Sequence, residues 1–489
     1  MNLSRRTRCN FPGKEIGTLL ANRAPMAAAR PAVRRGQVNI FDESRPMWSL
    51  FLIFLVPLLL SNILQAASQT VASIYLGQLI GVRALAAVSG IFPIIFLLIS
   101  FLIGLSSGST VLIGQAFGSG NVAAMKRVAG TTLTISLLLG IIVALIGFFL
   151  TPELLRLIGT PHDIFDGATV YAEILFASCP MFFPYLAYTT FIRGTGDSQT
   201  PFYVLFVSTA LIAILTPAFI LGWAHLPRLG VASAAIAGYI GNSVAFVGLL
   251  VLLARRKDPL SFDFEMIRDM RVDWKIFKTV VRLGVPIGLQ VIMVALAEIA
   301  VITFVNRFGS DATAAYGAVN QIVGYVQFPA ISIGIAASIF GAQCIGARRE
   351  DKLNSVIRSG VGLNYIIGGI IITICYIFAW QILGWFVTSK HPLDIAHGLL
   401  MITLWSYLLF GNSSVLSGVM RSSGTVFWPT VNGIFAIWGV EVPAAWILMH
   451  KFGIDGIWMG YPIAYVVVVL LQFTYYELFW KRKTHERLI

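Results

Sequence analysis

The chain has 489 residues, of which 57% are hydrophobic and only 12% are charged. A soluble globule of this size needs more polar surface, so the composition excludes that class and indicates an integral membrane protein. The net charge of +13 is spread over a tail and many loops, so nucleic acid is not expected as a partner.

The N-terminal stretch is rich in Arg, Ala and Pro and lacks the apolar core of a secretory signal. We expect residues 1–46 to form a basic, disordered tail in the cytoplasm. An organelle transit peptide and a start codon assigned too early stay open as alternatives.

Twelve apolar stretches follow, each of about 20 residues or more, the length that a helix needs to cross a bilayer. They do not alternate between apolar and polar residues as barrel strands do. We expect six spans within residues 47–254, a cytoplasmic linker over 255–279 with a short amphipathic helix, six spans within 280–480 and a cytoplasmic tail over 481–489. The predicted spans cover residues 50–79, 84–115, 128–150, 166–191, 200–224, 230–254, 280–306, 312–343, 356–388, 396–419, 427–450 and 454–480.

The basic residues mark one side of this arrangement. With the N-terminus placed inside, 29 of the 35 lysines and arginines fall on the inner side and six on the outer side. The positive-inside rule therefore predicts that both termini are cytoplasmic. The expected location is the plasma membrane, which is the inner membrane in a bacterium.

The second half of the chain repeats the first. IGQAFGSGN at Ile113 pairs with GAQCIGARR at Gly341, and RGTGDSQTP at Arg193 pairs with RSSGTVFWP at Arg421, both at an offset of 228 residues. Six spans per copy is an even number, so both copies enter the membrane the same way up. We expect an all-α membrane protein with two six-helix bundles related by a pseudo-twofold axis along the membrane normal.

These segments, together with the paired VP starts and the stretches ALAAVSG and ATAAYGAVN, resemble the multidrug and toxic compound extrusion (MATE) family over about residues 46–480. The resemblance implies a V-shaped secondary antiporter that exports organic, often cationic, compounds in exchange for protons or sodium ions. The chain has no Walker loop, dinucleotide fingerprint or zinc-ligand spacing. We therefore expect no enzyme activity, no catalytic residues, no cofactor and no bound metal.

Glu298 lies inside the apolar stretch VPIGLQVIMVALAEIAVITFV. An isolated charge there costs at least about 2.5 to 3.5 kcal/mol, so the acid indicates a function. Counted along the helices from flanking charged residues, Glu298, Glu441 and Asn320 reach one level in the outer half of the bilayer. We expect them to form a coupling-ion site, with a permanently protonated structural acid as the alternative.

The corresponding first-half positions are Gln69, Ala213 and Phe92, so the acids are confined to the second bundle. The resemblance implies an aspartate in the first helix, where this chain has Ala72, or a glutamate that aligns with Val294, one turn before Glu298. It also implies an aspartate on the tenth helix, which is missing here. Protons are the preferred coupling ion because one or two carboxylates can titrate, whereas sodium needs several oxygen ligands, and sodium stays open.

Weaker candidates for a substrate cavity are Gln69, Gln290, Tyr325, Tyr407 and Phe182. The expected partners are small organic substrates, the coupling cation and membrane lipid, and the expected state is a monomer. A flippase or exporter of a lipid-linked or polysaccharide substrate is the alternative function. An arginine-lined cavity would favour it, and we expect no well-buried Arg or Lys in the spans.

Overall fold

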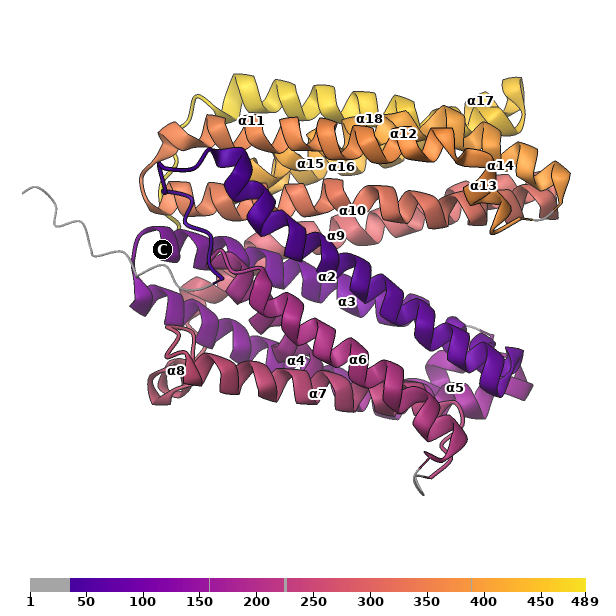
Figure 1. The fold of residues 1–489 in the computed structure, drawn as a ribbon, viewed down its shortest axis with the longest axis horizontal. Coiled ribbons are helices and arrows are strands. Elements are labelled where there is room, and N and C mark those ends of the chain that lie inside the picture. Colours follow the sequence, from indigo (N-terminus) through magenta and orange to yellow (C-terminus); the bar gives the residue numbers. More distant parts are fainter. Residues whose placement is uncertain (1–35, 158, 224–226, 388) are drawn as a thin grey trace, which may run out of the picture.

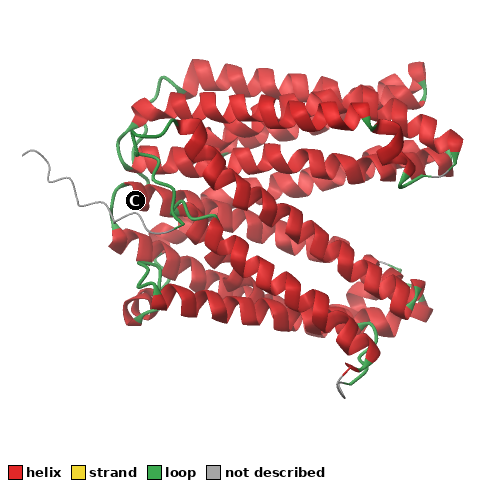
Figure 2. Ribbon diagram, in the orientation of Figure 1, coloured by secondary structure: helices red, strands yellow, loops and turns green. Residues whose placement is uncertain are grey.

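The computed structural model describes residues 36–157, 159–223, 227–387 and 389–489, which are almost entirely helical (Figure 2). The isolated β-bridge in this part of the chain joins Gln37 to Asp197. Twelve helical stretches of the described residues are long and apolar enough to cross a membrane. The predicted all-α fold with twelve spans is confirmed.

Six stretches come from the first half of the chain, and their uninterrupted apolar composition explains their length, because a helix pairs its own backbone groups where water is absent. They are α2 (Met47–Tyr75), which continues as a π-helical segment to Ile80, α3 (Val82–Gly118), α4 (Val122–Leu157), α5 (His162–Gly194), α6 (Gln199–Leu221) and α7 (Ala232–Arg255). The short α8 (Phe264–Asp269) lies in the linker, as predicted.

The other six stretches come from the second half. They are α9 (Trp274–Val305), α10 (Ser310–Gly346), α11 (Leu353–Leu363) with α12 (Gly369–Ile377), α14 (Lys390–Thr403) with α15 (Tyr407–Ser422), α16 (Phe427–Ile434) with α17 (Val442–Phe452), and α18 (Ile454–Tyr475); α13 (Ala379–Gly384) precedes α14. Gly81 and Gly309, 228 residues apart, break the chain before α3 and α10 with φ values of 121° and 96°. Glycine adopts such angles readily, so the repeat extends to the backbone conformation.

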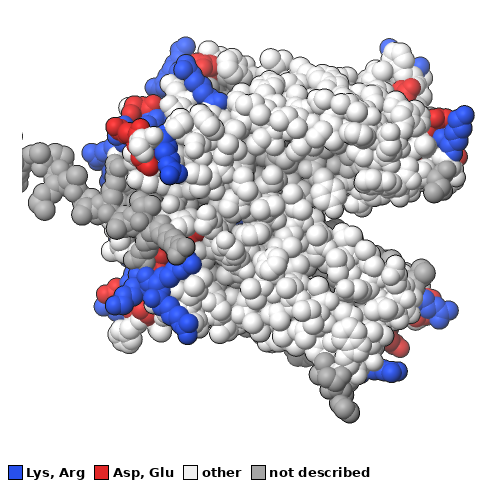
Figure 3. All heavy atoms as spheres, in the orientation of Figure 1, with Lys and Arg blue, Asp and Glu red and all other residues white. Residues whose placement is uncertain are grey.

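The two halves form a V (Figure 1). They meet at the end where the C-terminus lies, which we call the closed end, and diverge toward the opposite, open end. Charged side chains gather at both ends and leave a wide uncharged band between them (Figure 3). Large apolar side chains stay exposed on α4, such as Phe149 at 71% and Leu145 at 56%, which suits a surface that faces lipid.

Helices α2 and α9 cross from one half to the other. Phe51 and Phe54, near the start of α2, pack on Phe340 of α10 with ring centroids 4.8 and 5.3 Å apart, and α2 then runs diagonally toward α6 and the open end (Figure 1). In α9, Val280 belongs to a core cluster built largely from first-half helices, whereas Val301 belongs to a second-half cluster. Each half therefore contains part of a helix that belongs to the other repeat.

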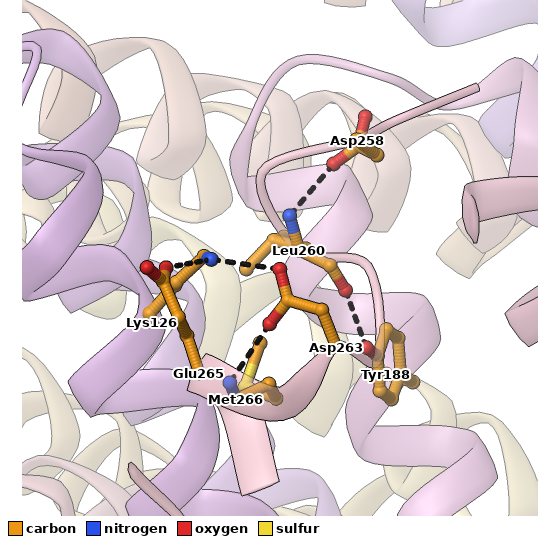
Figure 4. Close-up of polar contacts among 7 residues, drawn as sticks. All are labelled: Lys126, Tyr188, Asp258, Leu260, Asp263, Glu265 and Met266. Atoms are coloured by element: carbon orange, nitrogen blue, oxygen red, sulfur yellow. Dashed lines mark hydrogen bonds and ion pairs between the residues drawn. The ribbon is translucent and has the colours of Figure 1, made fainter. Parts of the chain in front are cut away.

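The linker is anchored to the first half (Figure 4). The Lys126 ammonium of α4 lies 2.9 Å from the Asp263 carboxylate and 2.6 Å from the Glu265 carboxylate. The Tyr188 hydroxyl of α5 donates a hydrogen bond to the Leu260 carbonyl. These contacts from two first-half helices fix the linker on both sides of the start of α8.

Two aspartates cap the helices of the linker region. The Asp263 carboxylate accepts a hydrogen bond from the Met266 N–H at 2.8 Å. Burial raises the pKa of Asp263, but this bond and the Lys126 ammonium outweigh burial, so the net shift of the pKa is downward. Asp273 accepts from two N–H groups in the first turn of α9, which explains why that helix begins at Trp274, inside the predicted linker.

The segment 36–46 is ordered. Val38 and Ile40 are buried, at 6% and 1% exposed, in a core cluster with residues of α10. The Val38 N–H donates to the Gly196 carbonyl at 3.0 Å. The prediction of a disordered tail is wrong for this segment, because three apolar residues, Val38, Ile40 and Phe41, pack against the core at the closed end. Residues 1–35 lie outside the described residues.

Candidate functional site

A cleft separates the two halves at the open end (Figure 3). Nearer the closed end, α3 and α9 touch at their glycines. A Cβ atom on Gly104 would lie 2.4 Å from the Gly284 carbonyl oxygen and 2.8 Å from the Gly288 nitrogen. The two backbones are therefore in direct contact, as small residues permit in membrane helices.

Glu441 is buried in the second half, at 6% exposed. It is the last residue of the π-helical segment Phe435–Glu441, which connects α16 to α17. π-Helical turns are rare and frequently occur at functional sites. Pro443 follows two residues later and has no N–H to donate to the preceding turn. The irregular backbone and the buried acid therefore coincide.

Tyrosines from three helices lie within electrostatic range of this acid. The hydroxyls of Tyr316 on α10 and Tyr461 on α18 are 3.0 Å apart. The rings of Tyr407 on α15 and Tyr465 on α18 have centroids 5.3 Å apart. Tyr316, Tyr407, Tyr461 and Tyr465 all interact electrostatically with Glu441. The acid thus has neutral hydroxyl groups as its neighbours.

Glu298 and Asn320 belong to the same neighbourhood. The Tyr316 hydroxyl interacts with the Asn320 side chain and lies in the electrostatic field of both glutamates. Glu298 and Glu441 also interact with each other. The three residues that the sequence predicted to converge therefore all lie within electrostatic range of Tyr316, and the tyrosines lie near them. We call this group, Glu298, Asn320, Glu441, Tyr316, Tyr407, Tyr461 and Tyr465, the acidic cluster.

The two acids differ in accessibility. Glu298 is exposed on α9, whereas Glu441 is buried. Two carboxylates within electrostatic range repel each other when both are charged, so a cation bound between or upon them is favoured. The tyrosine hydroxyls and the Asn320 amide offer further oxygen atoms. The cluster can chemically accept either a proton or a small metal cation.

The first half has no matching acids. Gln69 of α2 is exposed and Ala213 of α6 is apolar and partly buried. Among the described residues, no group of three or more His, Cys, Asp or Glu side chains is arranged to hold a metal ion. The first-half positions equivalent to Glu298 and Glu441 therefore carry no carboxylate, although Glu173 lies within α5.

The five weaker cavity candidates do not gather at one place. Tyr407 is buried in the acidic cluster, and Phe182 packs partly buried in the first half against Phe183. Gln290 accepts a hydrogen bond from Arg421 at 2.9 Å, toward the closed end. Tyr325 is 47% exposed on α10, and Gln69 is exposed on α2. Only Tyr407 therefore joins the coupling candidates.

Two arginines that lie just beyond the predicted spans are partly buried. Arg193 and Arg421, equivalent residues of the repeat, lie in the last turns of α5 and α15, and their Nε atoms are buried without a hydrogen-bond partner. Both helices extend beyond the predicted spans, and the meeting of the two halves covers their ends. Because both arginines lie at the closed end and not at the acidic cluster, they do not by themselves favour the lipid-linked substrate.

Sequence reasoning missed three tyrosines of the cluster. Tyr316 is one helical turn before Asn320, and Tyr461 is one turn before Tyr465, so each pair lies on one helix face. Two such pairs in apolar helices at the depth of an acid are a usable signal.

The chain matches the MatE family model twice, over residues 57–219 and 286–447. It is 53% identical to the probable multidrug resistance protein YoeA of Bacillus subtilis, over 91% of this chain and 97% of that protein. It is 24% identical to the multidrug export protein MepA of Staphylococcus haemolyticus, over 90% and 96% of the two chains. A mutant of the Vibrio cholerae MATE transporter VcmN has a similar fold, with a TM-score of 0.81 at 21% identity, covering 89% of this chain and 98% of that one.

Proposed function

The chain belongs to the MatE family of multidrug efflux transporters, and from that premise we propose that it is a secondary antiporter for organic compounds. It is a multi-pass membrane transporter and not an enzyme. The exported compounds are cationic or amphipathic, and the exchanged ion is a proton, with sodium as the second choice. Access to the two sides of the membrane alternates as the halves rock against each other.

The acidic cluster is the observation that carries this proposal. With the cleft open, Glu298 is charged and accessible, and an organic cation in the cleft is attracted to it. When a coupling cation neutralises the carboxylate, the organic cation loses that attraction and leaves. Both ligands act on one charge, so their binding is coupled and an ion gradient drives export without ATP.

The proton is preferred because the oxygens around the acids are mainly hydroxyls of tyrosines, which are weak ligands for sodium. Sodium binding needs several good oxygen ligands at short distance, whereas a carboxyl group needs only solvent access to load a proton. Glu298 is exposed and has that access, whereas Glu441 is buried.

We place the closed end in the cytoplasm of a cell whose plasma membrane, the inner membrane in a bacterium, holds the protein as a monomer. The excess of basic residues on that side supports this orientation. Lys257 is exposed at the closed end and Lys390 at the open end. In intact cells an impermeant maleimide should label a cysteine placed at 390 but not one placed at 257; the reverse labelling would contradict the orientation.

Transport by Glu298→Gln tests the mechanism. A proton gradient or, in separate experiments, a sodium gradient is imposed across everted membrane vesicles. The transport of a cationic dye into the vesicles is then followed. The variant should insert normally but lose the gradient-driven movement, whereas the first-half control Gln69→Ala should keep most of it. Wild-type rates in Glu298→Gln, with unchanged dependence on pH and sodium, would assign coupling to another site.

A further inference from the structure

Two equivalent glutamines join the halves at the closed end. Gln115 of α3 donates from Nε2 to the Ser422 carbonyl at the end of α15, at 2.8 Å. Gln343 of α10 donates from Nε2 to the Gly194 carbonyl at the end of α5, at 2.9 Å. Donors and acceptors are each related by the 228-residue offset, since 343 − 115 and 422 − 194 both equal 228. The pair is therefore a two-fold repeated contact in which each half binds the other.

The glutamines are buried and the backbones around them touch. Gln115 and Gln343 are each 1% exposed. A Cβ atom on Gly118 would lie 2.1 Å from the Gln343 carbonyl oxygen, and one on Gly346 would lie 2.0 Å from the Gln115 carbonyl oxygen. Such close approach excludes water from both hydrogen bonds as long as the two halves are together at this end.

The C-terminus adds a third contact at the same place. The Leu488 N–H donates to Oε1 of Gln115 at 2.9 Å. The Leu488 side chain also packs on a largely first-half core cluster and lies next to Gly424, where a Cβ atom would meet it at 3.0 Å. A segment that follows the last helix of the second half therefore holds the first-half glutamine in its bonding orientation.

We propose that Gln115 and Gln343 are the positioning residues of the inner gate, and that Leu488 orients the first of them. This inference rests on the proposed transport function, because alternating access requires that this end also opens. While the gate is closed, each amide satisfies a helix-terminal carbonyl that is shielded from water; when it opens, water takes over that role. The hydrogen bonds therefore favour the closed gate, by about fivefold in population for each bond.

Distances between spin labels on the full chain measure the gate without substrate or gradient. Arg255 at the end of α7 and Asn354 at the start of α11 are exposed on different halves. The labels are attached to cysteines placed at these two positions, Arg255→Cys and Asn354→Cys, in a protein whose native cysteines have been replaced. Gln115→Ala or Gln343→Ala should raise the ratio of long to short distances about fivefold, and the double variant about 25-fold. The control Gln321→Ala, an exposed glutamine on α10, should leave the ratio unchanged.

A chain that ends at Arg487 removes the Leu488 contact without changing any helix, and it should shift the ratio in the same direction. This variant decides the question if a glutamine variant does not fold. Unchanged ratios in the folded variants and in the shortened chain would overturn the proposal. A shifted ratio in a protein that moves no dye would keep the gate and refute the proposed transport function instead.

Discussion

The contact between α3 and α9 makes a prediction about one methyl group. In Gly104→Ala the new Cβ atom would lie 2.4 Å from the Gly284 carbonyl oxygen, although real Cβ atoms essentially never approach within 3.0 Å of another heavy atom. The two nearest atoms, the Gly284 oxygen and the Gly288 nitrogen, are backbone atoms of α9, so no side chain can rotate away. The helices must separate by several tenths of an ångström, and overpacking of this kind costs about 1–3 kcal/mol.

Thermal unfolding in detergent, followed by tryptophan fluorescence, measures this cost. With an unfolding entropy of about 2 cal/mol/K for each residue, a loss of about 1–3 kcal/mol lowers the Tm of a chain this long by about 1–3 °C. The matched control is Gly248→Ala on α7, where a Cβ atom has no heavy atom within 4 Å. Alanine favours a helix over glycine, so the control should be neutral or slightly more stable. Equal Tm values for the two variants would refute the backbone contact.

Three further predictions concern the closed end. Lys126→Met removes both ion pairs of the linker, whose carboxylates are largely exposed, so we expect the linker to lose about 1 kcal/mol of local stability. Trypsin should then cleave at Arg271 about fivefold faster. Unchanged cleavage would argue against the anchor. The pKa of Asp263 is lowered in the folded protein, so the stabilisation by this anchor is complete above 3.8, the ordinary pKa of an aspartate, and is lost as the pH falls through the lower folded-state pKa. Hydrogen exchange of α8, corrected for intrinsic rates, should therefore stay slow from pH 7 to 5 and accelerate only below about pH 3.8. Asp197 accepts a hydrogen bond from the Thr200 N–H in the first turn of α6 at 2.9 Å. Asparagine caps a helix as well as aspartate does, so Asp197→Asn should keep the Tm, while Asp197→Ala should lose about 1 kcal/mol of stability; equal losses would contradict the capping role.

The length and depth of the helices were predictable, because the membrane imposes both. Apolar stretches of a fixed minimum length gave the twelve spans. The positions of Glu298, Glu441 and Asn320 along their helices placed them at one level, and in the structure all three lie within electrostatic range of Tyr316. Depth in a membrane is a one-dimensional quantity that counting residues can supply.

Lateral neighbours were not predictable in the same way. The apolar face of a helix has the same composition whether it meets lipid or another helix, so the crossing of α2 and α9 could not be identified from the sequence. The partial burial of Arg193 and Arg421 depends on the meeting of the two halves, which no single helix encodes. Val38 and Ile40 were hidden for the same reason, because their partners lie on α10.

The crossing of α2 has a consequence for biosynthesis. Phe51 and Phe54 are in the first span to leave the ribosome, yet their partner Phe340 is synthesised almost 290 residues later. At about 5–20 residues per second, the rings wait roughly 15–60 s for it. Lipid tails are as apolar as the missing helix and cover the rings during that time. The bilayer thus takes the part that a chaperone would play for a soluble chain, and the earliest span completes its packing only after most of the protein has been inserted.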